Sequence, residues 1–266
     1  MIPLSFAQRR LWFLHRLEGP SATYNIPFVL RLDGPLDTDA LAAAIGDVVT
    51  RHESLRTLLV EHEDGTPAQH ILTPDRAPIP LPVREVAADA VQAAVHEMAS
   101  AGFALEADLP LRAGLLRQSP HQHVLVFVFH HTAADGASMG PFMRDLLAAY
   151  AARRHGTPPQ WQPLPVQYKD YTVWQRQMLG EEDDPDSVAA EQLAYWREEL
   201  AGVPQPVQLP LDRPRPTRAG HHGGHVDFRL EPELIAAVGR LAAAHGATAP
   251  MLAQAVLAVL LHHLGA

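Results

Sequence analysis

The sequence predicts an α/β fold in which a mixed β-sheet is covered by helices. Segments with helical and with strand periodicity alternate along the first two thirds of the chain. The stretch 123–129 is apolar on both alternating faces, which is typical of a central strand with helices on each side. Beyond 203–224, which is rich in proline and glycine, only one strand and two helices are predicted. These observations indicate one lobe and an incomplete second lobe.

Spacing and capping residues justify each element in turn. Ser5 is placed to cap the first helix, and Asp37 caps a second helix with an apolar stripe from Leu41 to Val49. The other helices are predicted at 87–100, 138–153, 166–179, 187–200, 232–245 and 248–264. The strands are predicted at 26–32, 55–61 with 69–73 as a hairpin, 111–117 with 123–129 around a Ser119-Pro120 turn, and 225–230.

Composition excludes several classes of function. The net charge of -9 argues against a protein that coats nucleic acid, since phosphate neutralisation needs an excess of Lys and Arg. The chain has no cysteine, so disulfides and thiolate metal sites are excluded. No secretory signal is recognisable, and no apolar run approaches the ~20 residues of a membrane helix. We therefore expect a cytoplasmic protein without nucleic-acid or membrane partners.

The stretch 129–138 carries the most informative chemistry. It lies where a buried strand ends and a helix begins, the place where α/β sheets present their sites. Because successive strand residues face opposite sides, only one of His130 and His131 can face a pocket. Gly136 permits a tight turn, and the amides after it lie at a helix amino terminus. A carboxylate such as Asp135 more often pairs with an arginine and fixes the loop.

Histidine suits a reaction in which an amine attacks an acyl carbon, because its pKa lets it exchange a proton near neutral pH. Taken alone, the pair is more readily explained as two ordinary histidines at a strand end. Three further histidines, His221, His222 and His225, fit no standard ligand spacing, so we expect no metal.

The motif His-His-x-x-x-Asp-Gly at 130–136 resembles the signature of the condensation-domain superfamily, which shares the chloramphenicol acetyltransferase fold. Four more segments resemble family motifs in the family's order. They are Ser5–Leu14 (SFAQRRLWFL), Arg51–Thr57 (RHESLRT), Tyr168–Arg176 (YKDYTVWQR) and the connector Leu209–Pro216 (LPLDRPRP). The chain resembles the amino-terminal part of a condensation domain from a nonribosomal peptide synthetase.

The resemblance implies three regions. Residues 1–180 correspond to the amino-terminal lobe that carries HHxxxDG, 181–224 to a helix and a proline-rich connector, and 225–266 to the beginning of a truncated second lobe. Family members join a donor acyl or peptidyl thioester to an acceptor aminoacyl thioester. Both substrates arrive on the 4'-phosphopantetheine of carrier proteins, and no cofactor is bound directly. The expected partners are an upstream and a downstream carrier protein, an adjacent adenylation domain and the missing lobe.

Carried over by position, His131 is the catalytic histidine, acting as a base or orienting the amine. Gly136 shapes the turn so that its amide faces the developing oxyanion. His130, Asp135, Arg51 and Arg56 are structural residues of the motifs, and either arginine could pair with Asp135.

Two positions depart from the usual family pattern. Ala137 stands where many relatives carry Trp, and Thr132 where an aliphatic residue is usual. Ala137 and Ser138 are candidates for lining the substrate tunnel. The aromatic residues Tyr168, Tyr171 and Trp174 recur at helical spacing, and such a stripe is usually core.

Three alternatives stay open. An epimerisation domain shares HHxxxDG but differs in the first motif. A noncatalytic recruitment domain usually lacks one of the two histidines. A stand-alone acyltransferase that uses coenzyme A is the third. The segment Ser21–Pro27 resembles subtypes that join an L-configured donor to an L-configured acceptor.

Overall fold

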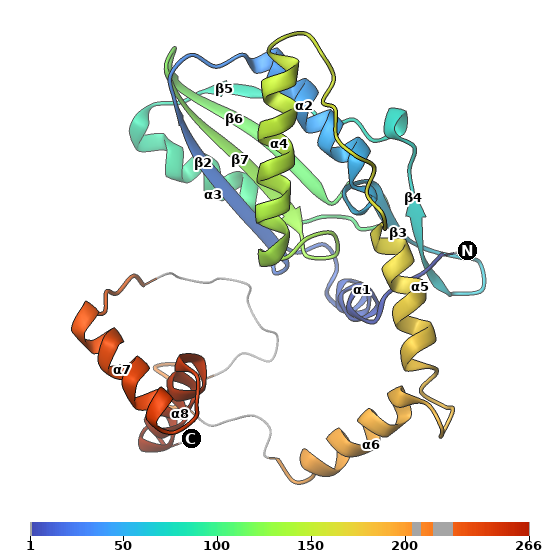
Figure 1. The fold of residues 1–266 in the computed structure, drawn as a ribbon, viewed down its shortest axis with the longest axis vertical. Coiled ribbons are helices and arrows are strands. Elements are labelled where there is room, and N and C mark those ends of the chain that lie inside the picture. Colours follow the sequence, from blue (N-terminus) through green and yellow to red (C-terminus); the bar gives the residue numbers. More distant parts are fainter. Residues whose placement is uncertain (1, 204–208, 215–225, 266) are drawn as a thin grey trace. The chain divides into compact units, whose positions relative to one another are not determined.

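The computed structural model describes residues 2–203, 209–214 and 226–265. The chain divides into two compact units, Met1–Leu193 and Ala194–Ala266 (Figure 1). The three regions that the sequence suggests, 1–180, 181–224 and 225–266, are not tested by this division and stay a prediction.

The main sheet of the first unit has four strands in the order β2-β7-β6-β5. The strands are β2 (Asn25–Asp33), β5 (Val83–Glu85), β6 (Leu111–Ser119) and β7 (Gln122–His130). β7 pairs antiparallel with both β2 and β6, whereas β5 pairs parallel with β6, so the sheet is mixed. The predicted pairing of 111–117 with 123–129 is confirmed.

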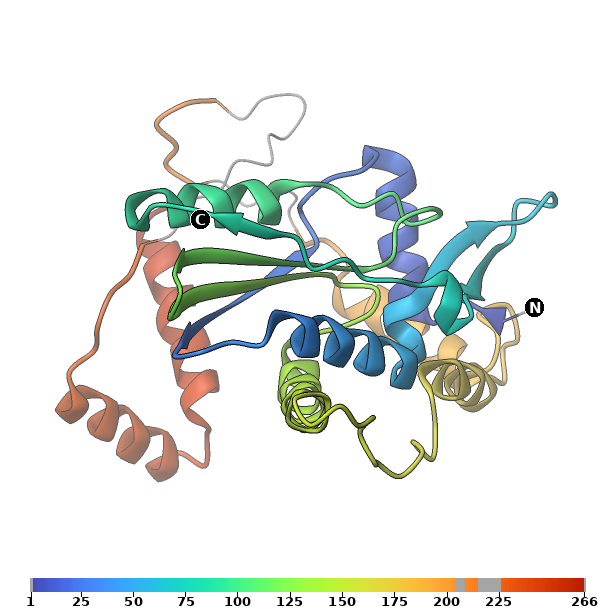
Figure 2. The same ribbon diagram turned by 90° about the horizontal axis from the view of Figure 1, so that it is seen from above.

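β7 is buried on both faces, as its sequence predicts. Its residues Leu125, Phe127 and Phe129 pack in a core with helices α2 (Thr38–Arg51) and α4 (Met139–Arg153). The intervening residues Val124, Val126 and Val128 pack in a second core that includes α3 (Val91–Ser100). Figures 1 and 2 show these helices on opposite faces of the sheet. The two cores hold the carboxyl end of β7 in a fixed place.

A second sheet of three strands lies beside the first unit's main sheet. Its order is β1-β4-β3, formed by β1 (Ile2–Pro3), β3 (Thr57–Glu61) and β4 (Pro67–Ile71). The hairpin of β3 and β4 confirms the prediction around Asp64-Gly65. The two short strands β1 and β5 have no counterpart among the predicted elements.

Helix α1 (Phe6–Glu18) begins as predicted, with Ser5 and Gln8 forming a reciprocal capping box. The unit also contains α5 (Tyr168–Leu179), and α6 (Val188–Glu199) crosses the division between the units. Short 3₁₀ turns are η1 (Glu53–Arg56), η2 (Pro74–Arg76), η3 (Ala88–Ala90) and η4 (Gly136–Ser138).

The second unit contains α7 (Pro232–Ala244) and α8 (Ala249–His263), both as predicted. The strand expected at 225–230 is wrong for the described part, 226–230, which has no regular structure. Val226 and Phe228 are 85% and 83% exposed, and among the described residues no strand is paired with this segment.

No described helix is by itself long and apolar enough to cross a membrane. Only α7 and α8 taken together meet the length and composition criteria, and they are bent by 100° at their junction.

Candidate active site

The two histidines at the end of β7 occupy opposite environments. His130 is the last residue of the strand and is 5% exposed, whereas His131 is exposed to solvent. The backbone N–H of His131 donates a 2.9 Å hydrogen bond to the carbonyl of Tyr24. The ring of Tyr24 makes edge contacts with both imidazoles, at 6.5 Å between centroids. The expectation that only one of the pair is presented is therefore met, and the presented ring is that of His131.

His130 is held as a neutral side chain. Its Nδ1 accepts the backbone N–H of Thr132 at 3.2 Å and lies 2.9 Å from the Thr132 hydroxyl. Burial, followed by the nearby His15, His131 and Arg112, lowers the pKa of His130 to about 4. An imidazole with such a pKa is neutral at physiological pH and serves to fix the loop that begins at residue 131.

Asp135 and Ser138 close that loop by bonding to each other. The Asp135 carboxylate accepts the backbone N–H of Ser138 at 2.9 Å and its hydroxyl at 2.6 Å, and Ser138 Oγ accepts the Asp135 N–H at 3.0 Å. The hydrogen bonds from Ser138 are the main reason that the pKa of Asp135 is lowered. The Asp135 carboxylate thus caps the start of η4.

The backbone conformation at position 136 does not require a glycine. Gly136 is not one of the described glycines with positive φ. A Cβ added at this position would meet no atom within 4 Å. Gly136 permits the turn that begins η4, as expected, but its φ is not in the left-handed region that would require glycine. The absent side chain instead leaves open space next to the loop.

The predicted pairing of Asp135 with an arginine is also wrong. Arg51 Nε donates to Oδ2 of Asp145 at 2.9 Å, and its Nη1 donates to the carbonyl of Gln162 at 2.7 Å. Arg56 bonds to the carbonyls of Leu72 and Thr50. Both guanidinium groups fasten the segment that follows α2, rather than the loop at Asp135.

Asp145 is the buried acceptor that sequence reasoning missed. It lies on the inner face of α4, 7% exposed, and its Oδ2 is 2.8 Å from Nε2 of His52 as well as bonded to Arg51. Burial raises the pKa of Asp145, but the hydrogen bonds from His52 and Arg51 outweigh it, so the net shift is downward. A carboxylate on the apolar face of a predicted helix is the sequence signal that could have identified Asp145 as a buried acceptor.

The two predicted tunnel residues differ in their surroundings. Ser138 lines a cavity of about 210 Å³, whereas Ala137 is exposed. The other residues that line this cavity are mostly apolar: Leu55, Phe129, Ala133, Ala134, Met139, Pro141 and Phe142, together with the polar His52 and Ser54. An apolar side chain can enter such a space.

Helix α5 meets the start of α1 through Tyr168. The phenol oxygen of Tyr168 lies 2.8 Å from Oγ of Ser5. Burial raises the pKa of Tyr168, and the charges of Tyr171 and Asp135 act in the same direction. The expectation that the aromatic stripe is core is wrong for Tyr171 and Trp174, which are 41% and 54% exposed, because only the Tyr168 end of the stripe lies against α1.

In the part of the chain that the structure describes, no group of three or more His, Asp or Glu side chains is arranged so that it could hold a metal ion. His221 and His222 lie outside that part, as does His225, so the expectation that they hold no metal stays a prediction.

A family model and known proteins match the chain over its whole length. A family model described as "Condensation domain" matches residues 1–266. The chain is 56% identical over 266 residues to a probable non-canonical nonribosomal peptide synthetase, CymA, of Salinispora arenicola, covering 100% of the chain and 3% of the relative. It is 49% identical to a dimodular nonribosomal peptide synthase of Bacillus subtilis, covering 100% of the chain and 11% of the relative.

Among solved structures, the X-domain from teicoplanin biosynthesis matches with a TM-score of 0.90 and 39% identity, covering 100% of this chain and 57% of that chain. The X-domain in complex with OxyB matches at 0.89, with 39% identity and the same coverage, 100% and 57%. The first condensation domain of the CDA synthetase shares the fold, with a TM-score of 0.75 at 23% identity, covering 100% and 63%. The chain thus spans less than two thirds of each of these proteins.

Proposed function

The chain belongs to the condensation-domain family of nonribosomal peptide synthetases, and on that premise we propose that it takes part in amide-bond formation between two carrier-bound thioesters. It has the chloramphenicol acetyltransferase-like fold of that family. The donor is an acyl or peptidyl thioester and the acceptor an aminoacyl thioester. Each is delivered on the phosphopantetheine arm of a carrier protein, and no cofactor is bound directly.

The single observation that carries this proposal is the exposed imidazole of His131 at the edge of the buried sheet. An exposed ring can reach an incoming amine, whereas the neutral His130 beneath it only fixes the loop. His131 would accept a proton from the attacking amine or orient that amine on the thioester carbon. Holding both substrates in one place supplies several kcal/mol of the rate gain, up to roughly 7–11 kcal/mol in well-oriented reactions.

Gly136 would act through its backbone amide and through the absence of a side chain. Because the Asp135 carboxylate interacts with the backbone N–H groups of Ser138 and Ala137, the amide of Gly136 is the candidate donor at the start of η4. A donor placed at the developing oxyanion stabilises the tetrahedral intermediate. The open space beside Gly136 would admit the thioester.

Further parts of the proposal concern partners. The solved relatives are longer than this chain, which supports a second lobe that completes the substrate tunnel. Carrier proteins upstream and downstream and an adjacent adenylation domain would complete the module. The segment Ser21–Pro27 favours an L-configured donor joined to an L-configured acceptor. We also propose a cytoplasmic location for the module.

The likeness to the X-domain favours a second candidate function, a noncatalytic platform that docks a partner protein. One solved relative is the X-domain in complex with OxyB. The chain keeps both His130 and His131, whereas recruitment relatives usually lose one, and we therefore rank catalysis first.

A condensation assay separates these functions. The chain, joined to a second lobe of a relative, is incubated with one carrier loaded with a donor and another loaded with an acceptor, and the dipeptidyl carrier is measured by mass spectrometry. We expect product with the natural sequence and none with His131→Ala, while circular dichroism of the variant is unchanged. A folded His131→Ala variant with full activity refutes the catalytic assignment, and an epimerised donor without condensation favours an epimerisation domain.

A further inference from the structure

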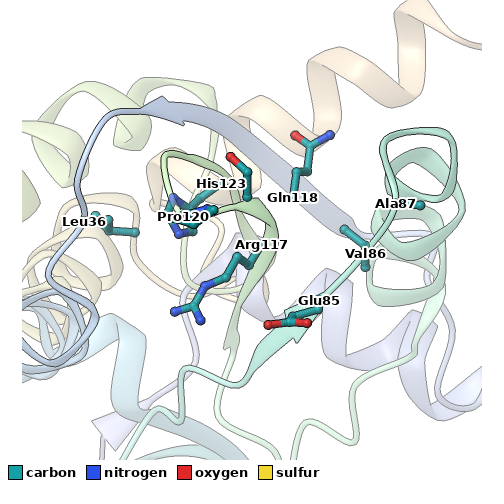
Figure 3. A pocket seen from close by; sticks show the side chains of 9 residues that line it. Leu36, Glu85, Val86, Ala87, Arg117, Gln118, Pro120 and His123 are labelled. Carbon is teal, nitrogen blue, oxygen red and sulfur yellow. The ribbon is translucent and has the colours of Figure 1, made fainter.

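A polar hollow lies at the other end of the main sheet from His131. Its volume is about 710 Å³, and its walls come from β5, the segment after it, and the turn between β6 and β7 (Figure 3). β7 runs from the turn to His130, and nine residues of strand span roughly 27 Å at about 3.3 Å per residue. An occupant of the hollow would not meet substrates held at His131.

Two opposite charges line the hollow from neighbouring strands. Glu85 of β5 and Arg117 of β6 are register partners in a parallel pair, so their side chains project from the same face of the sheet. Figure 3 shows both side chains within the hollow. Among the described residues, neither has an ion-pair partner within 4.0 Å, and the buried Nε of Arg117 has no hydrogen-bond partner. The Arg117 guanidinium and the Glu85 carboxylate do not pair with each other, so each can bind an oppositely charged group of a ligand.

His123 adds a buried, uncharged imidazole to the hollow. It is 3% exposed, and its Nδ1 has no hydrogen-bond partner among the described residues. Burial lowers its pKa, and the charges of Arg117 and His121 lower it further, which favours the neutral ring. A buried polar atom without a partner costs free energy, and a carboxylate that accepts the Nε–H of Arg117 would relieve that cost at the guanidinium.

We propose that this hollow binds a small zwitterion, an amino acid or a short peptide, with its carboxylate on Arg117 and its ammonium group on Glu85. A simple anion would be repelled by Glu85, and a simple cation by Arg117, whereas a zwitterion satisfies both. The volume lies within the roughly 300–1,000 Å³ of small-molecule sites. The carboxylate would also give the buried Nε–H of Arg117 an acceptor, once a small turn of the guanidinium brings that group to the ligand.

Isothermal titration calorimetry on residues 1–266 tests the proposal, with L-alanyl-L-alanine as the probe. Acetate and ethylamine, which carry one charge each, are the comparison ligands. We expect saturable dipeptide binding, with Arg117→Gln and Glu85→Gln each weakening it by about tenfold, the change that follows from losing one charged contact. The exposed pair Arg84–Glu97, 2.8 Å apart on the neighbouring surface, supplies matched controls, and Arg84→Gln and Glu97→Gln should bind as the natural chain does.

Three results overturn the proposal: no saturable heat with the dipeptide, equally tight binding of acetate, or unchanged affinity in both pocket variants. Glu85 is exposed, so its replacement keeps the fold and the test holds even where Arg117→Gln is unstable. Weakening by the control variants as strong as by the pocket variants would also count against it, because a general charge effect would then explain the binding.

Discussion

The phenol oxygen of Tyr168 and Oγ of Ser5 lie 2.8 Å apart, although 163 positions separate them in the chain. The same Ser5 oxygen accepts the backbone N–H of Gln8 at 3.1 Å and caps α1. Gln8 in turn contacts Gln69, whose amide donates to the hydroxyl of Thr172 on α5 at 3.2 Å. One buried polar network therefore ties α1, the second sheet and α5 together on the side of the unit that carries the loop at Asp135.

Removing either end of this contact should weaken the first unit. Tyr168→Phe deletes one buried hydrogen bond, and we expect the free energy of unfolding to fall by about 1 kcal/mol. Ser5→Ala deletes the bond and the helix cap together, so we expect a loss of about 2–3 kcal/mol. Urea denaturation followed by fluorescence measures both.

The double variant tests whether the two residues act on each other. Once Ser5 is alanine, Tyr168→Phe should cost little more, leaving a coupling of about 1 kcal/mol. Tyr171→Phe is the control, because its hydroxyl accepts only an exposed bond from Gln175. Strictly additive losses for Ser5 and Tyr168 would contradict the contact.

Asp145 and Asp135 should differ sharply in their contributions to stability. Asp145→Ala leaves Arg51 and His52 without their shared acceptor in a half-buried place, and we expect a loss of about 3 kcal/mol. Asp135→Ala removes an exposed cap of η4, so we expect about 1 kcal/mol or less. Thermal and urea unfolding of the two variants, side by side, should give this order. The reverse order would mean that Asp135 is the structural anchor after all.

Sequence reasoning succeeded where a residue's neighbours follow from periodicity. The alternation along β7 predicts both of its cores, and Ser5 predicts the start of α1, since both depend on residues close in the chain. β5 was not predicted, because three exposed residues show no period.

Partners chosen by the tertiary fold could not be predicted in the same way. Whether Arg51 meets Asp135 or Asp145 depends on which turn of α4 faces the end of α2, and the sequence does not encode that directly. Likewise, Tyr171 and Trp174 have the spacing of a core stripe but lie on a face that the first unit leaves exposed. The prediction that only one histidine of the pair is presented is confirmed, since His131 is exposed and His130 is buried. The catalytic role of His131 stays a prediction.

Gly136→Ala separates a structural from a catalytic role for this glycine. Because its φ lies outside the left-handed region and a Cβ would meet open space, we expect the stability to change by less than about 0.5 kcal/mol. Under the proposed function, the added methyl group occupies space that the thioester needs, so condensation should slow by about tenfold or more. Parallel unfolding and condensation assays decide between these roles. A stable variant with full activity would remove Gly136 from the proposed site.

The buried His130 should make the protein less stable in mild acid. Its pKa is 6.5 in an unfolded chain and about 4 in the fold, so between these values the unfolded state takes up a proton that the folded state refuses. The free energy of unfolding should therefore be fully present above about pH 6.5 and fall as the pH drops toward 4, by about 3 kcal/mol at most. His123, whose pKa is also lowered, adds to the fall in the same direction.

His130→Asn isolates this contribution, because the Asn oxygen can accept the Thr132 N–H in place of Nδ1 but does not titrate. Urea unfolding at about pH 7 and about pH 4.5 should show a smaller difference for the variant than for the natural chain, with His123 contributing to the difference that remains. The lowered pKa values of Asp135 and Asp145 act below their ordinary value of 3.8 and so leave this window unaffected. An identical pH dependence in the two proteins would show that His130 is not the neutral, buried base at the end of β7.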